Sequence, residues 1–143
     1  MYKTIRIDGD PILTQIAQPV VNVAAEQRLV SNMLLLLTID EEAVGLAAPQ
    51  VGESKRIIVI RKGNALVPMI NPIITGKFGG VEAANESCLS IPGKIVVVKR
   101  HRMVMLRYTD RRGNSQTLRA RGKTARVIQH EVDHLDGILI GGR

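Results

Sequence analysis

The stretch Gln129-His130-Glu131-Val132-Asp133-His134-Leu135-Asp136-Gly137 decides the organisation of the chain. Two histidines four residues apart project from one face of a helix, so both imidazoles can bind the same metal ion. Glu131 directly follows the first histidine, where its carboxylate can take a proton from a water on that ion. The pattern predicts a hydrolytic metal site. A solvated helix end with two unrelated histidines is the competing interpretation of so short a motif.

The spacing of apolar residues before and within this stretch favours a helix. One mostly continuous face is formed by Ala125, Val127, Ile128, Val132 and Leu135. Gly137 is the residue type that ends helices in a left-handed turn. We therefore expect both histidines to lie on a helix that ends near residue 137.

A catalytic zinc-type site needs a third protein ligand, and the candidates are a cysteine, a histidine and scattered carboxylates. Only the residues 135–143 follow His134, so the ligand must come from upstream, where Cys88 is the only cysteine and His101 the only other histidine. His101 lies in the basic cluster Lys99–Arg102, where repulsion disfavours a metal ion. A lone cysteine is otherwise often a small buried apolar residue. Because the two histidines already predict a metal site that lacks one ligand, a ligand role for Cys88 is favoured over simple burial.

Three motifs now carry a resemblance to a known family. They are Gly45-Leu46-Ala47-Ala48-Pro49-Gln50, Glu86-Ser87-Cys88-Leu89-Ser90 and the stretch 129–137. In this order, and at about these spacings, they resemble the peptide deformylases along nearly the whole chain. The resemblance implies a hydrolase that removes the N-formyl group from the initiator methionine of nascent polypeptides and releases formate.

The resemblance also implies roles for individual residues. Glu131 would pass a proton from the attacking water to the leaving amine, while two donors stabilise the oxyanion. The expected site residues are Cys88, His130 and His134 for the metal; Glu131, the Gln50 amide and the Leu89 backbone N–H for catalysis; and Val44, Gly45 and Val127 for substrate binding.

The expected cofactor is one divalent metal ion. One sulfur and two nitrogens suit Zn²⁺ by ligand chemistry, and Ni²⁺ or Co²⁺ are also compatible with them. The resemblance implies Fe²⁺ in the cell.

The chain departs from the family pattern near the expected substrate pocket. Ala43 and Ser87 stand where the family has glycine, and Ile95 stands about where it often has an arginine that holds the peptide. Arg126 is more polar than the family commonly allows at that position. We expect these residues to alter the substrate groove.

Length and pattern predict an α+β fold, with small antiparallel sheets packed around a central metal-binding HExxH helix. The chain has 143 residues, 45% of them apolar, which suits a single catalytic domain over 1–143. Asn22 can cap a helix over about 24–41. Segments 56–60, 66–74, 95–98, 103–106 and 116–118 read as strands, and the glycines 79–80 as a turn. The first segment, punctuated by turn residues, is expected to run extended over the surface.

Positive charge is concentrated in the second part of the chain, where residues 94–143 hold 12 basic and 4 acidic side chains. This half can contact the ribosome surface through phosphates, although a solvated sheet face explains the charge equally well. With no Trp, one Phe and two Tyr, the stacking surfaces of single-strand nucleic-acid binders are missing, so no specific nucleic acid is expected.

The location expected from the sequence is the cytoplasm. The start of the chain lacks the apolar run of a signal peptide, and the longest apolar stretch, Met33–Leu37, is too short to span a membrane. The chain resembles the short deformylases, including those of bacteriophages, for which the host cytoplasm would be the location.

Two other functions stay open at this point. An HExxH peptidase cutting internal peptide bonds would share the metal and Glu131 but would not need Cys88. A catalytically silent deformylase-like protein could bind RNA or the ribosome through its basic half. One observation argues against a catalytically silent protein, because a binding role would not need the full set of Gln50, Cys88, Glu131, His130 and His134.

Overall fold

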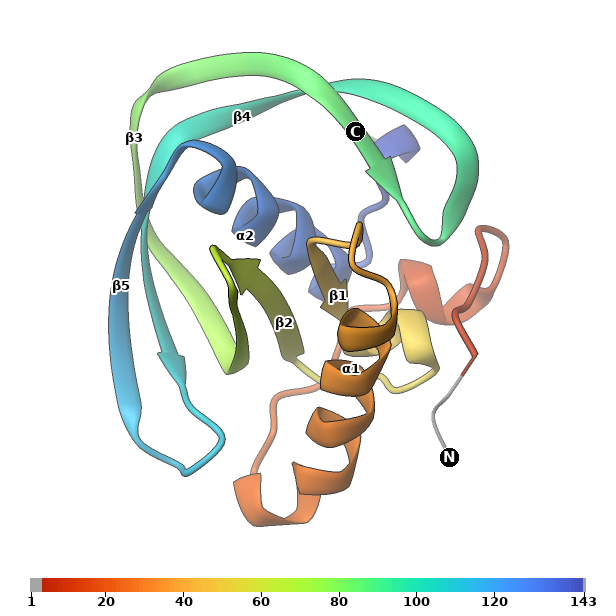
Figure 1. Ribbon diagram of the computed structural model, residues 1–143, viewed down its shortest axis with the longest axis vertical. Coiled ribbons are helices and arrows are strands. Elements are labelled where there is room, and N and C mark those ends of the chain that lie inside the picture. Colours follow the sequence, from red (N-terminus) through yellow and green to blue (C-terminus); the bar gives the residue numbers. More distant parts are fainter. Residues whose placement is uncertain (1–3, 143) are drawn as a thin grey trace.

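The computed structural model describes residues 4–142, and its largest element is a five-stranded antiparallel sheet. The strands pair in chain order: β1 (Gly45–Ala47), β2 (Ile57–Lys62), β3 (Ala65–Cys88), β4 (Ile91–Thr109) and β5 (Ser115–Arg121). The α-helices are α1 (Gln27–Ile39) and α2 (Gly122–Leu135), and short 3₁₀ turns form η1 (Pro11–Thr14), η2 (Val23–Glu26), η3 (Ala48–Val51) and η4 (Ile140–Gly142). Figure 1 shows the long β3–β4 hairpin arching over α2, with β1 and β2 on the other side of that helix.

The long strand β3 changes partners along its length. It pairs with β2 over residues 65–70 and with β4 from Ile70 onward. Pro68 therefore lies where β3 has a neighbour on one side only, and Pro72 lies in a register shift between Ile70 and Ile73. Gly79 and Gly80, both with positive φ, lie in a further register shift inside β3, between Phe78 and Val81, rather than in the turn expected from the sequence.

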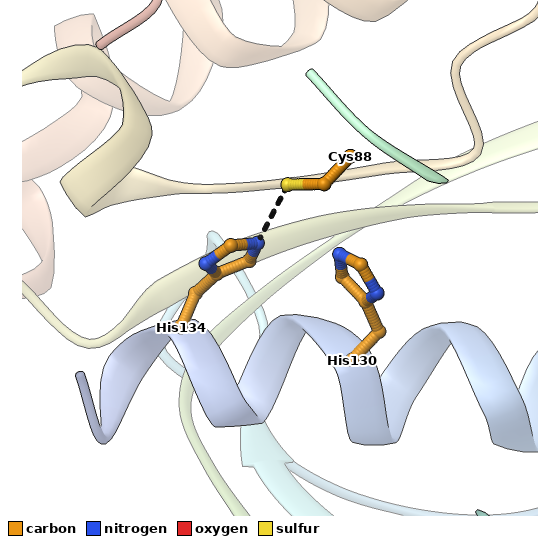
Figure 2. Close-up of side chains that lie close together, drawn as sticks. All are labelled: Cys88, His130 and His134. Atoms are coloured by element: carbon orange, nitrogen blue, oxygen red, sulfur yellow. Dashed lines mark hydrogen bonds between the residues drawn. The ribbon is translucent and has the colours of Figure 1, made fainter. Parts of the chain in front are cut away.

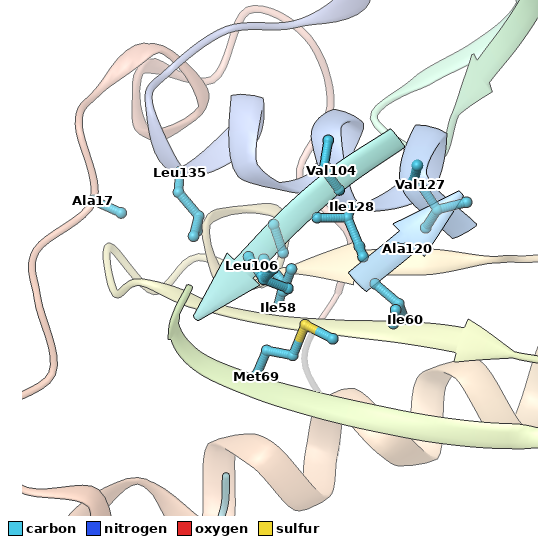
Figure 3. Close-up of a cluster of buried hydrophobic side chains, with 12 residues drawn as sticks. Ala17, Ile58, Ile60, Met69, Val104, Leu106, Ala120, Val127, Ile128 and Leu135 are labelled. Atoms are coloured by element: carbon cyan, nitrogen blue, oxygen red, sulfur yellow. The ribbon is translucent and has the colours of Figure 1, made fainter. Parts of the chain in front are cut away.

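Strand β2 separates two hydrophobic clusters because successive side chains point to opposite faces. Ile58 and Ile60 face α2, in a cluster that continues through Met69, Val104, Leu106, Val127, Ile128 and Leu135 (Figure 3). Ile57 and Val59 face α1, against Leu29, Val30, Met33 and Leu37. The continuous apolar run of β2 is thus explained by burial on both faces.

Specific polar contacts fix α2 on the sheet. The Gln129 side chain accepts the backbone N–H of His101 at 3.0 Å and donates to the carbonyl of the same residue at 2.8 Å. At the other end of the helix, Arg56 donates to the Leu135 carbonyl and pairs with Asp136, each at 2.9 Å, which places a cation at the helix C-terminus. Gly137 follows with φ +75°, so the helix ends where the sequence predicted.

The α+β prediction is confirmed, with one five-stranded sheet in the described residues in place of several small ones. Asn22 does act as a cap, accepting the Ala25 N–H at 3.3 Å, but it caps the 3₁₀ turn η2 and the α-helix itself spans residues 27–39. The first segment is not simply extended, because it forms η1 and buries Leu13 and Ala17. Over residues 4–142, no helix has the length and apolar character needed to cross a membrane.

Candidate metal centre and active site

The last residue of β3 and two positions on α2 bring together three side chains that could hold a metal ion. The ligand atoms of Cys88, His130 and His134 all lie within 4.8 Å of one another, and all three side chains are buried. In Figure 2 the Cys88 sulfur points at the ring of His134, whose Nε2 lies 3.3 Å away, while His130 stands one helical turn along. Cys88 and His134 are 46 positions apart in the sequence, and the fold brings them into one site.

Both histidines can offer Nε2 to a metal ion. The Nδ1 of His130 lies 2.8 Å from Glu86 Oε1, so this nitrogen carries the proton that it donates to the carboxylate and Nε2 is the nitrogen left to bind a metal ion. His134 presents Nε2 to the sulfur, and its buried Nδ1 has no hydrogen-bond partner among residues 4–142. The rings meet edge to face with centroids 5.0 Å apart, at an interplanar angle of 70°.

Behind His130, Glu86 is held by an unusually complete set of donors. Arg100 donates to both of its oxygens, at 2.8 and 2.9 Å, and Arg126 donates to Oε2 at 2.6 Å. Arg100 is only 3% exposed and also bonds Asp133 at 2.5 Å. Removing one partner from such a buried pair typically costs about 3–5 kcal/mol. The network therefore fixes the orientation of the His130 ring.

The pKa values of the metal-free cluster follow from burial and from these contacts. Burial alone would raise the pKa of Glu86, but hydrogen bonds from Arg100, His130 and Arg126 hold it far below its usual value. Burial would lower the pKa of His130, yet hydrogen bonds to Cys88 and Glu86 raise it to about 10. Burial, reinforced by the charge of His130, lowers the pKa of His134 to about 3. Glu86 thus stays ionised and His134 stays neutral, whereas His130 is protonated in the metal-free cluster and must lose the proton on Nε2 when a metal ion binds.

Glu131 lies between the histidines on α2 and is buried against β1. Burial raises its pKa to about 7, although the charges of His130 and Arg100 oppose the shift. Its Oε1 has no hydrogen-bond partner among the described residues. A carboxylate with a pKa near neutrality and an unpaired oxygen is suited to accept and return a proton at physiological pH.

Gly45 makes room for this carboxylate. A Cβ atom on Gly45 would lie 2.5 Å from Glu131 Oε2 and 2.9 Å from its Cγ, well inside van der Waals contact. The glycine of the first motif is therefore required at this position by the side chain of the third motif, and no local turn is involved.

A cavity of about 500 Å³ opens onto the cluster. Its lining includes Val44, Gly45, Gln50, Cys88, Leu89, Val127, His130 and Glu131. Eight of the nine site residues expected from the sequence therefore surround one space, and the ninth, His134, lies behind it with 1% exposure. His101, the rejected ligand candidate, is not in the metal-binding group.

The residues that depart from the family pattern lie in different places. Ala43 and Ser87 line the cavity, whereas Ile95 is absent from its lining and 72% exposed. Arg126 lines the cavity too, but its guanidinium is bound to Glu86 and to the carbonyls of Val98 and Glu82, at 2.9 and 2.7 Å. This arginine braces α2 against the β3–β4 hairpin.

Sequence reasoning missed the residues around Glu86. The sequence shows Arg100 only as a member of the basic cluster Lys99–Arg102, yet it points inward on the same side of β4 as Val98, Val104 and Leu106. The period-2 spacing 98, 100, 104, 106 was the available signal, because a charged residue on a buried strand face requires a buried partner of opposite charge. Glu86 and Asp133 are those partners.

The donor set fits one divalent transition-metal ion. One thiol sulfur and two imidazole nitrogens at this separation can bind a single cation and leave a coordination position for water or substrate. The unpaired Glu131 Oε1 lies in the same buried region, as expected of a group whose partner is that water.

Comparison with known proteins agrees with this geometry. The family model of polypeptide deformylase matches residues 2–143. A peptide deformylase of Pelotomaculum thermopropionicum is 44% identical over 140 residues, which cover 97% of this chain and 88% of that protein.

Solved structures give the same result. The crystal structure of peptide deformylase from Thermotoga maritima has a TM-score of 0.95 at 38% identity, covering 100% of this chain and 97% of that one. The enzyme of the Vibrio parahaemolyticus bacteriophage VP16T, solved in complex with actinonin, has a TM-score of 0.90 at 40% identity, covering 96% and 99%. The chain therefore belongs to the polypeptide deformylase family, metalloenzymes that remove the N-formyl group from nascent peptides.

Proposed function

We propose that Cys88, His130 and His134 hold the catalytic metal ion of this protein and that Glu131 is its general base. The observation that carries the proposal is the convergence of one sulfur and two ring nitrogens within 4.8 Å, beside a buried carboxylate with an unpaired oxygen. This sulfur ligand also distinguishes the site from that of an HExxH peptidase.

The chain's own groups then carry the reaction. A divalent ion in this site supplies an acidified water and polarises the formyl carbonyl. Glu131 takes a proton from that water as the water oxygen bonds to the formyl carbon, and it returns the proton to the amine nitrogen as the carbon–nitrogen bond breaks and the peptide leaves. The Gln50 amide and the Leu89 backbone N–H donate to the oxygen that becomes negative, each contributing about 3 kcal/mol in comparable sites. Formate and a free amino terminus are the products.

The substrate lies in the cavity that the same residues line. Val44 and Val127 supply apolar surface for the methionine side chain, and the backbone of Gly45 pairs with the extended peptide. The proposal is supported by the edge position of β1, which pairs with β2 only and has its other side free of strands in the described sheet. Ala43 and Ser87 narrow this groove relative to a glycine at each position.

Iron(II) is the proposed native metal, with Zn²⁺, Ni²⁺ and Co²⁺ as substitutes that the ligands accept. An iron–thiolate site is sensitive to oxidation of both metal and Cys88. An iron-loaded preparation should therefore lose activity in air faster than a nickel-loaded one. Equal decay of the two would remove the proposal.

The proposed partner beyond the peptide is the ribosome surface, met by the basic half of the chain in the cytoplasm of the cell or, for a phage-encoded protein, of its host. Support comes from exposed arginines at alternate positions of adjacent strands, with Arg107 on β4 and Arg119 and Arg121 on β5. Phosphate contacts predict steep loss of ribosome co-sedimentation as salt rises. No binding at low salt would exclude the contact.

Formate release from a formyl-methionyl tripeptide tests the function directly. The metal-loaded protein over 1–143, acting as a single catalytic domain, should release formate. Glu131→Ala should lower kcat by at least about 100-fold, because positioned proton transfer contributes roughly 10²–10⁴-fold. Glu41→Ala, which removes an exposed carboxylate outside the cavity lining, is the control and should keep full activity. Full activity of Glu131→Ala would contradict the proposed role.

A further inference from the structure

Ser90, the residue after Leu89, is a fully buried serine for which the proposed mechanism has no use. Its side chain is 0% exposed, and its carbonyl accepts the N–H of Asp8 at 2.7 Å, which fixes its backbone. It lies at the turn between β3 and β4, two residues after Cys88. A hydroxyl group buried so close to the reacting centre needs a partner.

That partner is the amide of Gln50. The Ala47 backbone N–H donates to Gln50 Oε1 at 2.9 Å, and since an N–H can only donate, this bond establishes which end of the amide is oxygen. The other end, Nε2, therefore faces Ser90 Oγ at 3.2 Å and Cys88 Sγ at 3.6 Å. Gln50 itself is 2% exposed, so no solvent competes for these bonds.

The two anchors act together on the amide. With Oε1 bound to Ala47 alone, the NH₂ group could still swing about that bond. The Ser90 hydroxyl holds one of its two hydrogens, and the planar geometry of the amide then aims the other toward Cys88 and the cavity. That second hydrogen is the one a developing oxyanion would receive.

We infer that Ser90 is a positioning residue, which acts through Gln50 by aiming the second N–H of its amide at the substrate carbonyl. The inference rests on the proposed role of Gln50 as an oxyanion donor. Ser90 contributes to the transition state only, because the carbonyl oxygen becomes a strong acceptor only there.

A double-mutant cycle tests this coupling. Ser90→Ala should lower kcat about tenfold with KM unchanged, and Gln50→Ala about 100- to 1,000-fold, the range for a lost oxyanion donor. The double variant should be no slower than Gln50→Ala alone, since Ser90 has nothing left to position. An equal further loss in the Gln50→Ala background would show a general structural role and overturn the inference, as would an unchanged kcat in Ser90→Ala.

A spectroscopic measurement keeps the inference testable whatever the activity. In unmutated, zinc-loaded protein labelled with ¹⁵N-glutamine, the Gln50 side-chain NH₂ should show a nuclear Overhauser contact to the Ser90 β-protons. In Ser90→Ala, the chemical shifts of the two Gln50 NH₂ protons should change, while those of the other five glutamine side chains should not. Absence of the contact would overturn the inference even if the variant failed to fold. If the contact is present but the protein releases no formate, the proposed function fails and the placement of the amide stands.

Discussion

Gly45→Ala tests how closely the first and third sequence motifs depend on each other. The added Cβ would stand 2.5 Å from Glu131 Oε2, whereas ordinary contact begins at about 3.4 Å, so one group must move by about 0.9 Å. Glu131 is 3% exposed, so its carboxylate can move away only toward the cavity that it lines. A misplacement of about 1 Å in a reacting group can cost about 100-fold in rate.

The expected result is a kcat for formate release about 100-fold below that of the unmutated protein, with little change in melting temperature. Gly45 lies in β1 outside the positive-φ region, so alanine fits its backbone and the fold should survive. Gly141→Ala is the matched control, because a Cβ there meets nothing within 4 Å and its φ is not positive. A Gly45→Ala variant with kcat within about threefold of the original would refute the argued contact between these motifs.

Further predictions concern the metal, pH and the fold. Cys88→Ser should weaken zinc binding by at least tenfold in a chelator competition, because a hydroxyl is a far poorer ligand than a thiolate, and unchanged affinity would exclude sulfur ligation. In metal-free protein, the pKa of Glu131 is raised by burial to about 7, so the folded state retains a proton that the unfolded chain releases above about pH 4.5. The stability that protonated Glu131 contributes is therefore lost as pH rises to 7. Between pH 4.5 and 7, the free energy of unfolding of Glu131→Gln, measured in urea, should rise by about 3 kcal/mol relative to that of the unmutated protein. Parallel pH profiles of the two proteins would contradict the pKa shift. Gly137→Ala should lower the melting temperature by several degrees, because its Cβ would meet the Thr14 carbonyl oxygen at 2.6 Å and its φ is +75°; an unchanged melting temperature would show that this helix end is not constrained as described.

The local motifs were readable from the sequence because each depends on chemistry at short range. A helix with histidines four residues apart needs only periodicity and ligand spacing, and Gly137 marks its end by its own conformational freedom. Cys88 was preferred to His101 and to the scattered upstream carboxylates because it lies in a turn-like segment away from the basic cluster. The helix and strand patterns predicted the α+β class and the resemblance to the deformylases supplied the reaction, and the comparisons bear both out.

What the sequence did not reveal depends on contacts between distant strands. The partners of Glu86 lie on β4 and α2, at separations of 14, 40 and 44 residues, and the register of the β3–β4 hairpin decides which of them meet. The composition of the glycine pair 79–80 predicts a turn, but β3 continues to pair with β4 on both sides of it, with a register shift at this point. Ser90 carries no sequence signal of its own, because its role depends on the orientation of the Gln50 amide.

The central claim is that one metal ion, held through Cys88, is the catalyst, and titration of metal-free protein with cobalt(II) tests it most directly. The sulfur-to-cobalt absorption and the rate of formate release should rise together and saturate at one equivalent of metal, and Cys88→Ser should show neither. Formate release without metal, or full activity of Cys88→Ser with no sulfur absorption, would contradict the account.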